Sequence, residues 1–134
     1  MVDALRRAHR IVAPGGFVLD LHPSAARASV EIGDEATGHV EAGDAPLRHA
    51  AAGAALAAAI DEGLFAVEHA LVFTFFTYGD TIEELRDYVV ENWRDGQIDD
   101  ETVHRTRAAA HHAGGVRPRI REHVHATKLR PRIR

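Results

Sequence analysis

Residues 4–23 read ALRRAHRIVAPGGFVLDLHP, and this stretch carries the most structural information in the chain. Apolar residues recur at helical spacing up to Val12, which predicts a helix over the N-terminal segment. Pro14 cannot continue that helix, and the two glycines after it suit a tight turn with positive φ. The apolar run Phe17–Leu21 then predicts a short strand that is covered on both faces.

The rest of the chain alternates between helical and strand-like patterns. An Ala-rich helix is expected over residues 46–62, and a long strand, covered by layers on both sides, over residues 64–78. A weak hairpin between residues 29–32 and 39–42, or an irregular excursion there, is expected, and a half-exposed strand over residues 117–129. Two further helices are predicted, one beginning at Asp80 or Thr81 and the other at Asp99 or Asp100, with a buried stripe in the first of Ile82, Leu85, Tyr88, Val89 and Trp93.

Together these patterns predict one mixed α/β domain over residues 1–134. We expect a small, mainly antiparallel sheet of about three to five strands with about four helices packed on it. The chain has no Cys, which excludes disulfides and thiolate metal sites. No apolar run reaches the roughly 18 residues that a membrane span needs, and arginines interrupt any signal-peptide core, so a cytoplasmic protein is expected.

The order of these segments resembles a known family. A helix, a (L/V)xPGG turn and an apolar strand follow one another in residues 5–23, as they do at the fifth strand of Rossmann-like S-adenosylmethionine-dependent methyltransferases. The stretches FTFFTYGDTIEELRDYVVENW and HVHATKLR resemble the later part of that fold more loosely. In that family the last two strands form an antiparallel pair beside the fifth. The resemblance therefore implies a methyltransferase-like C-terminal half.

The chain departs from this family at the cofactor. It contains no GxGxG turn, so the resemblance assigns it no cofactor-binding residue, and S-adenosylmethionine is expected only if another half is supplied. Methyl transfer by this chain alone is not expected. We instead predict a substrate-side, dimerisation or regulatory module, or a truncated methyltransferase. Without its fourth-strand neighbour, Phe17–Leu21 is an open apolar edge, which predicts a homodimer or a partner subunit there.

A few residues are candidates for a site. Asp20 and His22 share a strand face at the end where that family binds its substrate, and they are candidates for an acid/base pair. Ser24 lies just beyond them, and Tyr78 ends the long strand. These two are the substrate-binding candidates. The alternative function is a small standalone enzyme or ligand-binding protein with a cleft near Asp20, His22 and Tyr78. The competing interpretation of Asp20 and His22 is that they are simply residues at a strand end.

Charge and histidine content suggest two further hypotheses. The chain has a net charge of −4, yet residues 117–134 hold seven basic residues against Glu122 alone. Such a segment could contact phosphate, but the acidic chain has no nucleic-acid motif, so nucleic acid is not an expected partner. Among the ten histidines, His123 and His125 are two apart on a strand and are the candidate metal ligands. The alternative is chance clustering, and no metal is predicted.

Overall fold

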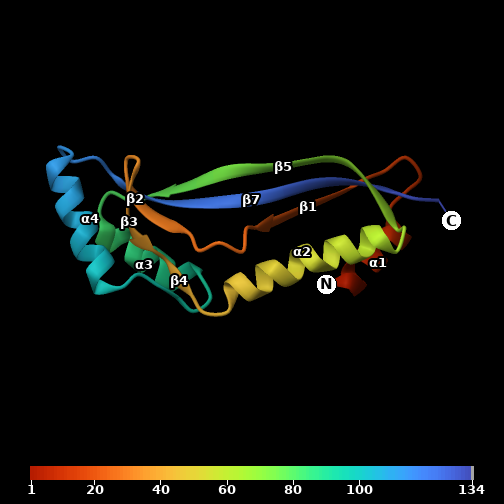
Figure 1. Cartoon of the computed structure of the whole chain (residues 1–134), viewed down its shortest axis with the longest axis horizontal. Helices are drawn as coiled ribbons and strands as arrows, with labels where there is room; N and C mark the ends of the chain where they lie inside the picture. The colour runs from red at the N-terminus through yellow and green to blue at the C-terminus, as the bar shows by residue number, and fades with distance from the viewer. Residues whose placement is uncertain (134) are drawn as a thin grey trace.

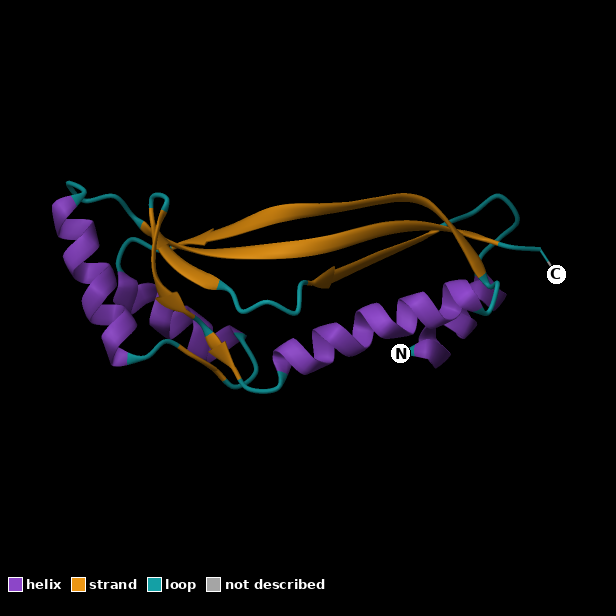
Figure 2. Cartoon of the chain, viewed as in Figure 1, coloured by secondary structure: helices purple, strands orange, loops and turns teal. Residues whose placement is uncertain are grey.

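A computed structural model describes residues 1–133, and they form four helices and seven strands (Figures 1 and 2). The helices are α1 (Val2–Ile11), α2 (Ala45–Asp61), α3 (Ile82–Asn92) and α4 (Asp100–His112). The strands are β1 (Val18–Pro23), β2 (Ser29–Ile32), β3 (Glu35–His39), β4 (Glu41–Ala42), β5 (Phe65–Tyr78), β6 (Gly96–Gln97) and β7 (Pro118–Pro131). This architecture confirms the mixed α/β class. No helix within the described residues is both long and apolar enough to cross a membrane.

Strand β7 organises the main sheet. β5 pairs with one edge of β7 along almost its whole length, and β1 and β2 share the other edge one after the other. β1 lies opposite residues 124–129 of β7, and β2 lies opposite residues 118–121. β3 extends the sheet beyond β2, while β4 and β6 form a separate two-stranded ribbon. All of these pairs are antiparallel.

The molecule has two hydrophobic cores, one at each end of the β5/β7 ribbon (Figure 1). The first, which we call the α3/α4 lobe, consists of Val30, Val40, Ile82, Leu85, Val89, Ile98, Val103 and Ile120. The second, the α1/α2 lobe, consists of Leu5, Leu56, Ala59, Leu64, Phe65 and Leu129. Among the strands, only β7 contributes a residue to both cores, Ile120 to the first and Leu129 to the second.

The two cores lie on opposite faces of β7. Ile120 and Leu129 are both fully buried, but they are an odd number of residues apart, so their side chains leave opposite faces of the strand. The right-handed twist that accumulates along a strand rotates these faces and brings each toward its own helices. β7 therefore serves the α3/α4 lobe with one face and the α1/α2 lobe with the other.

The prediction that two strands are covered on both faces is wrong. Leu19 and Leu21 in β1 are 55% and 56% exposed, and Leu71 in the middle of β5 is 56% exposed. Their apolar pattern matches a doubly covered strand, but α2 lies along only one side of this sheet (Figure 2). Phe17 precedes β1 and is also half exposed.

The local helix signals are largely confirmed. Thr81 caps α3, where its hydroxyl accepts a hydrogen bond from the Glu84 amide at 3.1 Å. Asp99 caps α4 in the same way, accepting from the Thr102 amide at 2.7 Å. Tyr88 was predicted to be buried but is 41% exposed, because it lies at the margin of the stripe that packs on the core.

The predicted hairpin is wrong in its second strand. β2 pairs with Glu35–His39, which follows the tight turn at Gly33, and Glu41–Ala42 instead pairs with β6. Gly38 in β3 is required by close packing, since a Cβ there would lie within 2.8 Å of three side-chain atoms of Thr102 in α4. This contact fixes α4 against the outer strand of the sheet.

Candidate functional site

A gap on one edge of β7 opens a cleft between the two lobes. β1 pairs with β7 only from Val124 onward and β2 only up to Arg121, so Glu122 and His123 have no strand beside them on that edge. The linker between β1 and β2 bows away there; its Ser24 amide donates a hydrogen bond to the His123 carbonyl at 2.7 Å, and its Ala28 carbonyl accepts one from the Val40 amide at 2.9 Å. The resulting cleft has a volume of about 250 Å³.

The cleft has mainly apolar walls. One wall comes from the start of α2 and another from the segment that ends α3, where Trp93 packs partly on the α3/α4 core. The linker contributes the third wall. The apolar lining side chains are Pro23, Ala26, Ala28, Val40, Ala42, Ala45, Pro46 and Trp93. A concave apolar surface with a few polar groups is the usual form of a small-molecule site.

Two titratable side chains in the cleft are perturbed by burial. Burial raises the pKa of the Glu122 carboxyl above its ordinary value, because the charged form loses hydration. The pKa of His49 in α2 is lowered, chiefly by burial. A hydrogen bond with the Ser24 backbone opposes this shift, and the charges of Arg48 and His22 add to it. Perturbed groups that face one cleft are typical of functional sites.

The arginines of the cleft are mostly neutralised by neighbouring carboxylates. Arg27 contacts Glu41 at 2.6 Å, and Arg48 contacts Asp44 at 3.0 Å. Arg121 contacts the buried Glu31 at 2.9 Å. A fourth guanidinium, that of Arg94, is exposed and has no ion-pair partner within residues 1–133.

The structure brings Asp20 and His22 together. His22 Nδ1 lies 2.6 Å from Asp20 Oδ2, and both side chains are only 14% exposed. The His22 ring stacks on that of His125, with centroids 5.3 Å apart. A Cβ added at Gly53 in α2 would lie 3.8 Å from His22 Nε2, so the free nitrogen faces the helix. This geometry orients the imidazole but leaves little room for a substrate beside it.

The other predicted residues lie apart from this pair. Ser24 Oγ accepts a hydrogen bond from the Ala26 amide at 3.2 Å, which stabilises the linker turn. Tyr78 pairs with Arg119 of β7, whereas His22 pairs with His125, six residues further along the strand. At about 3.3 Å per residue this separation is about 20 Å. Asp20, His22 and Tyr78 therefore do not share one cleft.

The histidines of β7 have different surroundings. His123 lines the cleft and lies within 3.5 Å of the Thr74 hydroxyl, whereas His125 stacks on His22. Within residues 1–133 no group of three or more His, Asp or Glu side chains is arranged to hold a metal ion.

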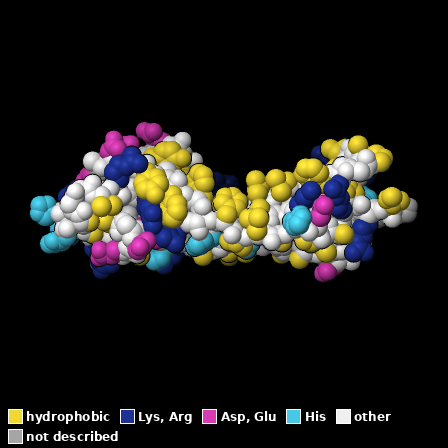
Figure 3. All heavy atoms as spheres, turned by 90° about the horizontal axis from the view of Figure 1, so that it is seen from above, with side chains coloured by type: hydrophobic (Ala, Val, Ile, Leu, Met, Phe, Trp, Pro, Cys, Tyr) yellow, Lys and Arg dark blue, Asp and Glu magenta, His cyan; other side chains and the backbone are white. Residues whose placement is uncertain are grey.

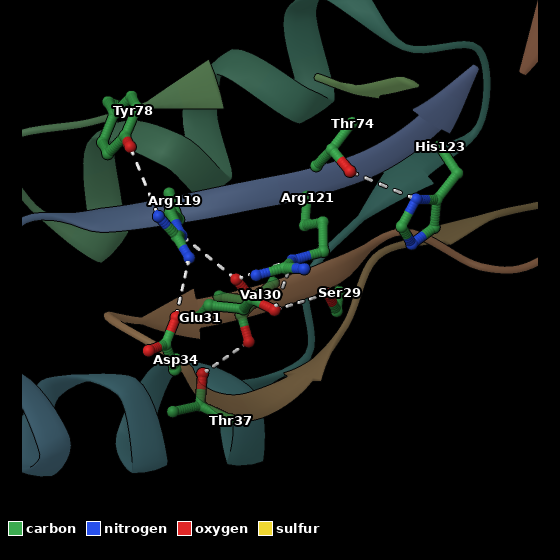
Figure 4. Close-up of polar contacts among 10 residues, drawn as sticks. All are labelled: Ser29, Val30, Glu31, Asp34, Thr37, Thr74, Tyr78, Arg119, Arg121 and His123. Carbon is green, nitrogen blue, oxygen red and sulfur yellow. Dashed lines mark hydrogen bonds and ion pairs between the residues drawn. The ribbon is translucent and has the colours of Figure 1, made fainter. Parts of the chain in front are cut away.

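The basic strand is tied to carboxylates (Figure 4). Glu31 in β2 lies between Arg119 and Arg121, with Nε to carboxylate distances of 3.0 and 2.9 Å. The Arg119 guanidinium also lies 4.1 Å from the centroid of the Phe76 ring and donates a hydrogen bond to the Tyr78 hydroxyl at 3.4 Å. These contacts fasten β2, β7 and β5 together, so these two arginines are engaged within the fold.

Apolar side chains gather on the face of the ribbon opposite to α2. The register places Leu21, Ala126 and Leu71 side by side, and Val124 lies next to Phe73 on the same face. Seen from above, hydrophobic side chains run along the narrow part of the molecule between the lobes (Figure 3). We define the apolar face as Leu19, Leu21, Leu71 and Phe73, which are 39% to 56% exposed. Within residues 1–133, β1 pairs with β7 alone, so its outer edge is open beside this face.

Sequence reasoning did not single out Glu122 or His49 as functional candidates. The available signal was that Glu122 is the one acidic residue among the seven basic residues of the last segment.

Comparisons with protein families, with curated proteins and with solved structures find no match to this chain.

Proposed function

We propose that this protein is a methyltransferase-like module of the substrate-side, dimerisation or regulatory kind, without a cofactor loop of its own. The strand order supports this proposal, because β5 and β7 form an antiparallel pair and β7 lies beside β1, the strand that follows the PGG turn. The resemblance leads us to expect an antiparallel pair of strands beside the strand that follows this turn. The proposal assigns the module to the cytoplasm and requires no bound cofactor in the isolated chain.

The open edge of β1 and the apolar face carry the proposal. An unpaired strand with apolar neighbours is a ready template for another chain. In a doubly wound fold both would be covered, the edge by the next parallel strand and the face by helices. We therefore propose that a second copy of the chain, or a subunit that carries the cofactor-binding half, covers this surface.

The sequence of β1 suits pairing with a second copy. If two β1 strands pair antiparallel about Leu19, Phe17 of one copy faces Leu21 of the other, and Asp20 faces Val18. No like charges lie opposite one another in this register, and the apolar faces of the two copies become continuous. A homodimer of this kind would form one extended sheet.

The oligomeric state tests the proposed interface. We expect sedimentation velocity to give about twice the monomer mass for the natural chain and the monomer mass for the double variant Leu19→Lys, Leu21→Lys. Leu47→Lys is the matched control, because Leu47 is 75% exposed on α2, away from the apolar face. If the natural chain stays monomeric at every concentration, the homodimer is excluded. If both variants dissociate alike, the dimer does not depend on the apolar face and the proposed interface is excluded.

Calorimetric titration with S-adenosylhomocysteine tests the cofactor part of the proposal. We expect no heat of binding from the purified protein, at a concentration at which any dimer persists. Micromolar binding would overturn the proposal, because it would require a cofactor site built from these residues.

A further inference from the structure

Glu122 is the one half-buried carboxylate of the cleft that has no partner. Within residues 1–133 no hydrogen bond or ion pair joins its side chain to another group, and burial is the single cause of its raised pKa. A carboxylate that loses hydration without gaining a hydrogen bond costs free energy. The fold therefore places a partly hydrated carboxylate without a protein partner on the lining of a cleft.

The surrounding charges leave this acceptor uncompensated. Arg27 pairs with Glu41 and Arg48 with Asp44. Arg121 shares Glu31 with Arg119, which also contacts Asp34 at 3.5 Å. Burial lowers the pKa of His49, which favours the neutral form of that side chain. His123 is exposed beside Thr74, and Arg94 is exposed to solvent. Among the half-buried side chains of the cleft, the charge left without a partner is thus negative.

The walls of the cleft define the rest of its ligand. Trp93 and the small apolar side chains offer a surface for a hydrocarbon group, and an aromatic ring also attracts a cation placed over its face. The volume of about 250 Å³ lies below the range of roughly 300–1,000 Å³ for drug-sized sites. A ligand of this site is therefore small.

We propose that the cleft binds a small organic amine, whose ammonium group donates to Glu122 and whose apolar part lies against Trp93. Glu122 supplies the charge complement, and the linker between β1 and β2 provides one wall of the site. The inference rests on the cleft alone and does not depend on the proposed methyltransferase-like role or on a dimer.

Intrinsic fluorescence gives a direct readout, because Trp93 is the single tryptophan of the chain and lines the cleft. The probe is benzylamine, with benzyl alcohol as its neutral analogue and benzoate as its anionic analogue. We expect saturable binding of benzylamine at pH 7.5, at least tenfold weaker binding of the alcohol and no binding of benzoate. Binding of benzylamine should weaken as the pH falls through the pKa of Glu122.

Two isosteric variants test whether amine binding depends on the Glu122 carboxylate itself or only on the net negative charge of the protein. Glu122→Gln should weaken benzylamine binding at least tenfold, with an unchanged circular dichroism spectrum. Glu91→Gln is the matched control, because Glu91 is an exposed carboxylate on α3 that does not line the cleft, and it should bind as the natural chain does. Three results would each overturn the proposal: no saturable binding, equal binding by Glu122→Gln, or a preference for benzoate.

Discussion

The two lobes share strand β7 but are stabilised by different interactions. The α3/α4 lobe combines a core rich in branched side chains with two capped helices and a carboxylate, Glu31, held between two arginines. The α1/α2 lobe depends on a smaller core around Phe65 and on an Ala-rich helix, and its contact between Arg6 and Glu62 is exposed. One long twisted strand can thus serve two cores, each through a different face.

The largest expected effects come from removing one side chain from each core. Phe65→Ala empties the centre of the α1/α2 lobe and should lower the free energy of unfolding by about 3–5 kcal/mol. Leu85→Ala does the same in the α3/α4 lobe and should cost about 2–5 kcal/mol. Chemical denaturation followed by circular dichroism measures both values.

The shape of these transitions tests whether the two lobes are one unit. β7 contributes Ile120 to one core and Leu129 to the other, so neither core can unfold without disturbing a strand of the other. We expect a single transition in each variant, with the same midpoint by circular dichroism and by fluorescence of Trp93. Two separate transitions would show that the ribbon does not couple the lobes.

The next largest effect is expected at Glu31, whose ion pairs with Arg119 and Arg121 distinguish the α3/α4 lobe. Glu31→Gln leaves the Arg119 and Arg121 guanidinium groups without their carboxylate in a largely buried position. We expect a loss of about 1–3 kcal/mol in the free energy of unfolding. The control is Glu62→Gln, which removes the exposed contact with Arg6 in the other lobe and should leave the denaturation midpoint unchanged. If Glu31→Gln and Glu62→Gln lower the free energy of unfolding equally, the ion pairs of the two lobes do not differ in their contribution to stability.

Local signals in the sequence predicted the elements well, whereas burial depended on the whole fold. The cap at Thr81 and the Pro-Gly-Gly turn act within a few residues, so their consequences could be predicted. The apolar runs in β1 and β5 predicted cover on both faces, but the number of layers is not a local property. The face of β7 that is buried also changes between Ile120 and Leu129, because twist accumulates along the strand.

The candidate site was harder to predict for a related reason. Asp20 and His22 are near neighbours on a strand, so their contact follows from local geometry. The cleft arises where β1 ends and β2 begins on the same edge of β7, and that register is set by the tertiary fold. Glu122 is exposed to a cleft only because of this gap. In the sequence its neighbours Arg121 and His123 indicate a solvated strand face, and no local pattern marks a cleft beside Glu122.

A smaller effect is expected in the ribbon between the lobes. Leu71 has the same chemistry as the core leucines but is 56% exposed, so Leu71→Ala should change the free energy of unfolding by less than about 1 kcal/mol. Leu129→Ala, across the ribbon in β7, should cost about 2–5 kcal/mol because Leu129 is fully buried. If Leu71→Ala in dilute protein costs as much as Leu129→Ala, the apolar face is covered in solution by something other than water.

The smallest expected effect is a gain in stability instead of a loss. It concerns Glu122, which lines the cleft between the lobes. The pKa of Glu122 is raised in the folded chain, so the folded state binds this proton more tightly than the unfolded state does. The ionised carboxylate therefore lowers stability at neutral pH, and this penalty disappears as the pH falls through the raised folded pKa to the ordinary value of about 4.3. Glu122→Gln should be slightly more stable than the natural chain at pH 7, and the two should converge at low pH. Thermal unfolding across this range measures the difference. A variant less stable than the natural chain at pH 7 would mean that Glu122 already has a stabilising partner, and the cleft would then have no unmet acceptor to offer a ligand.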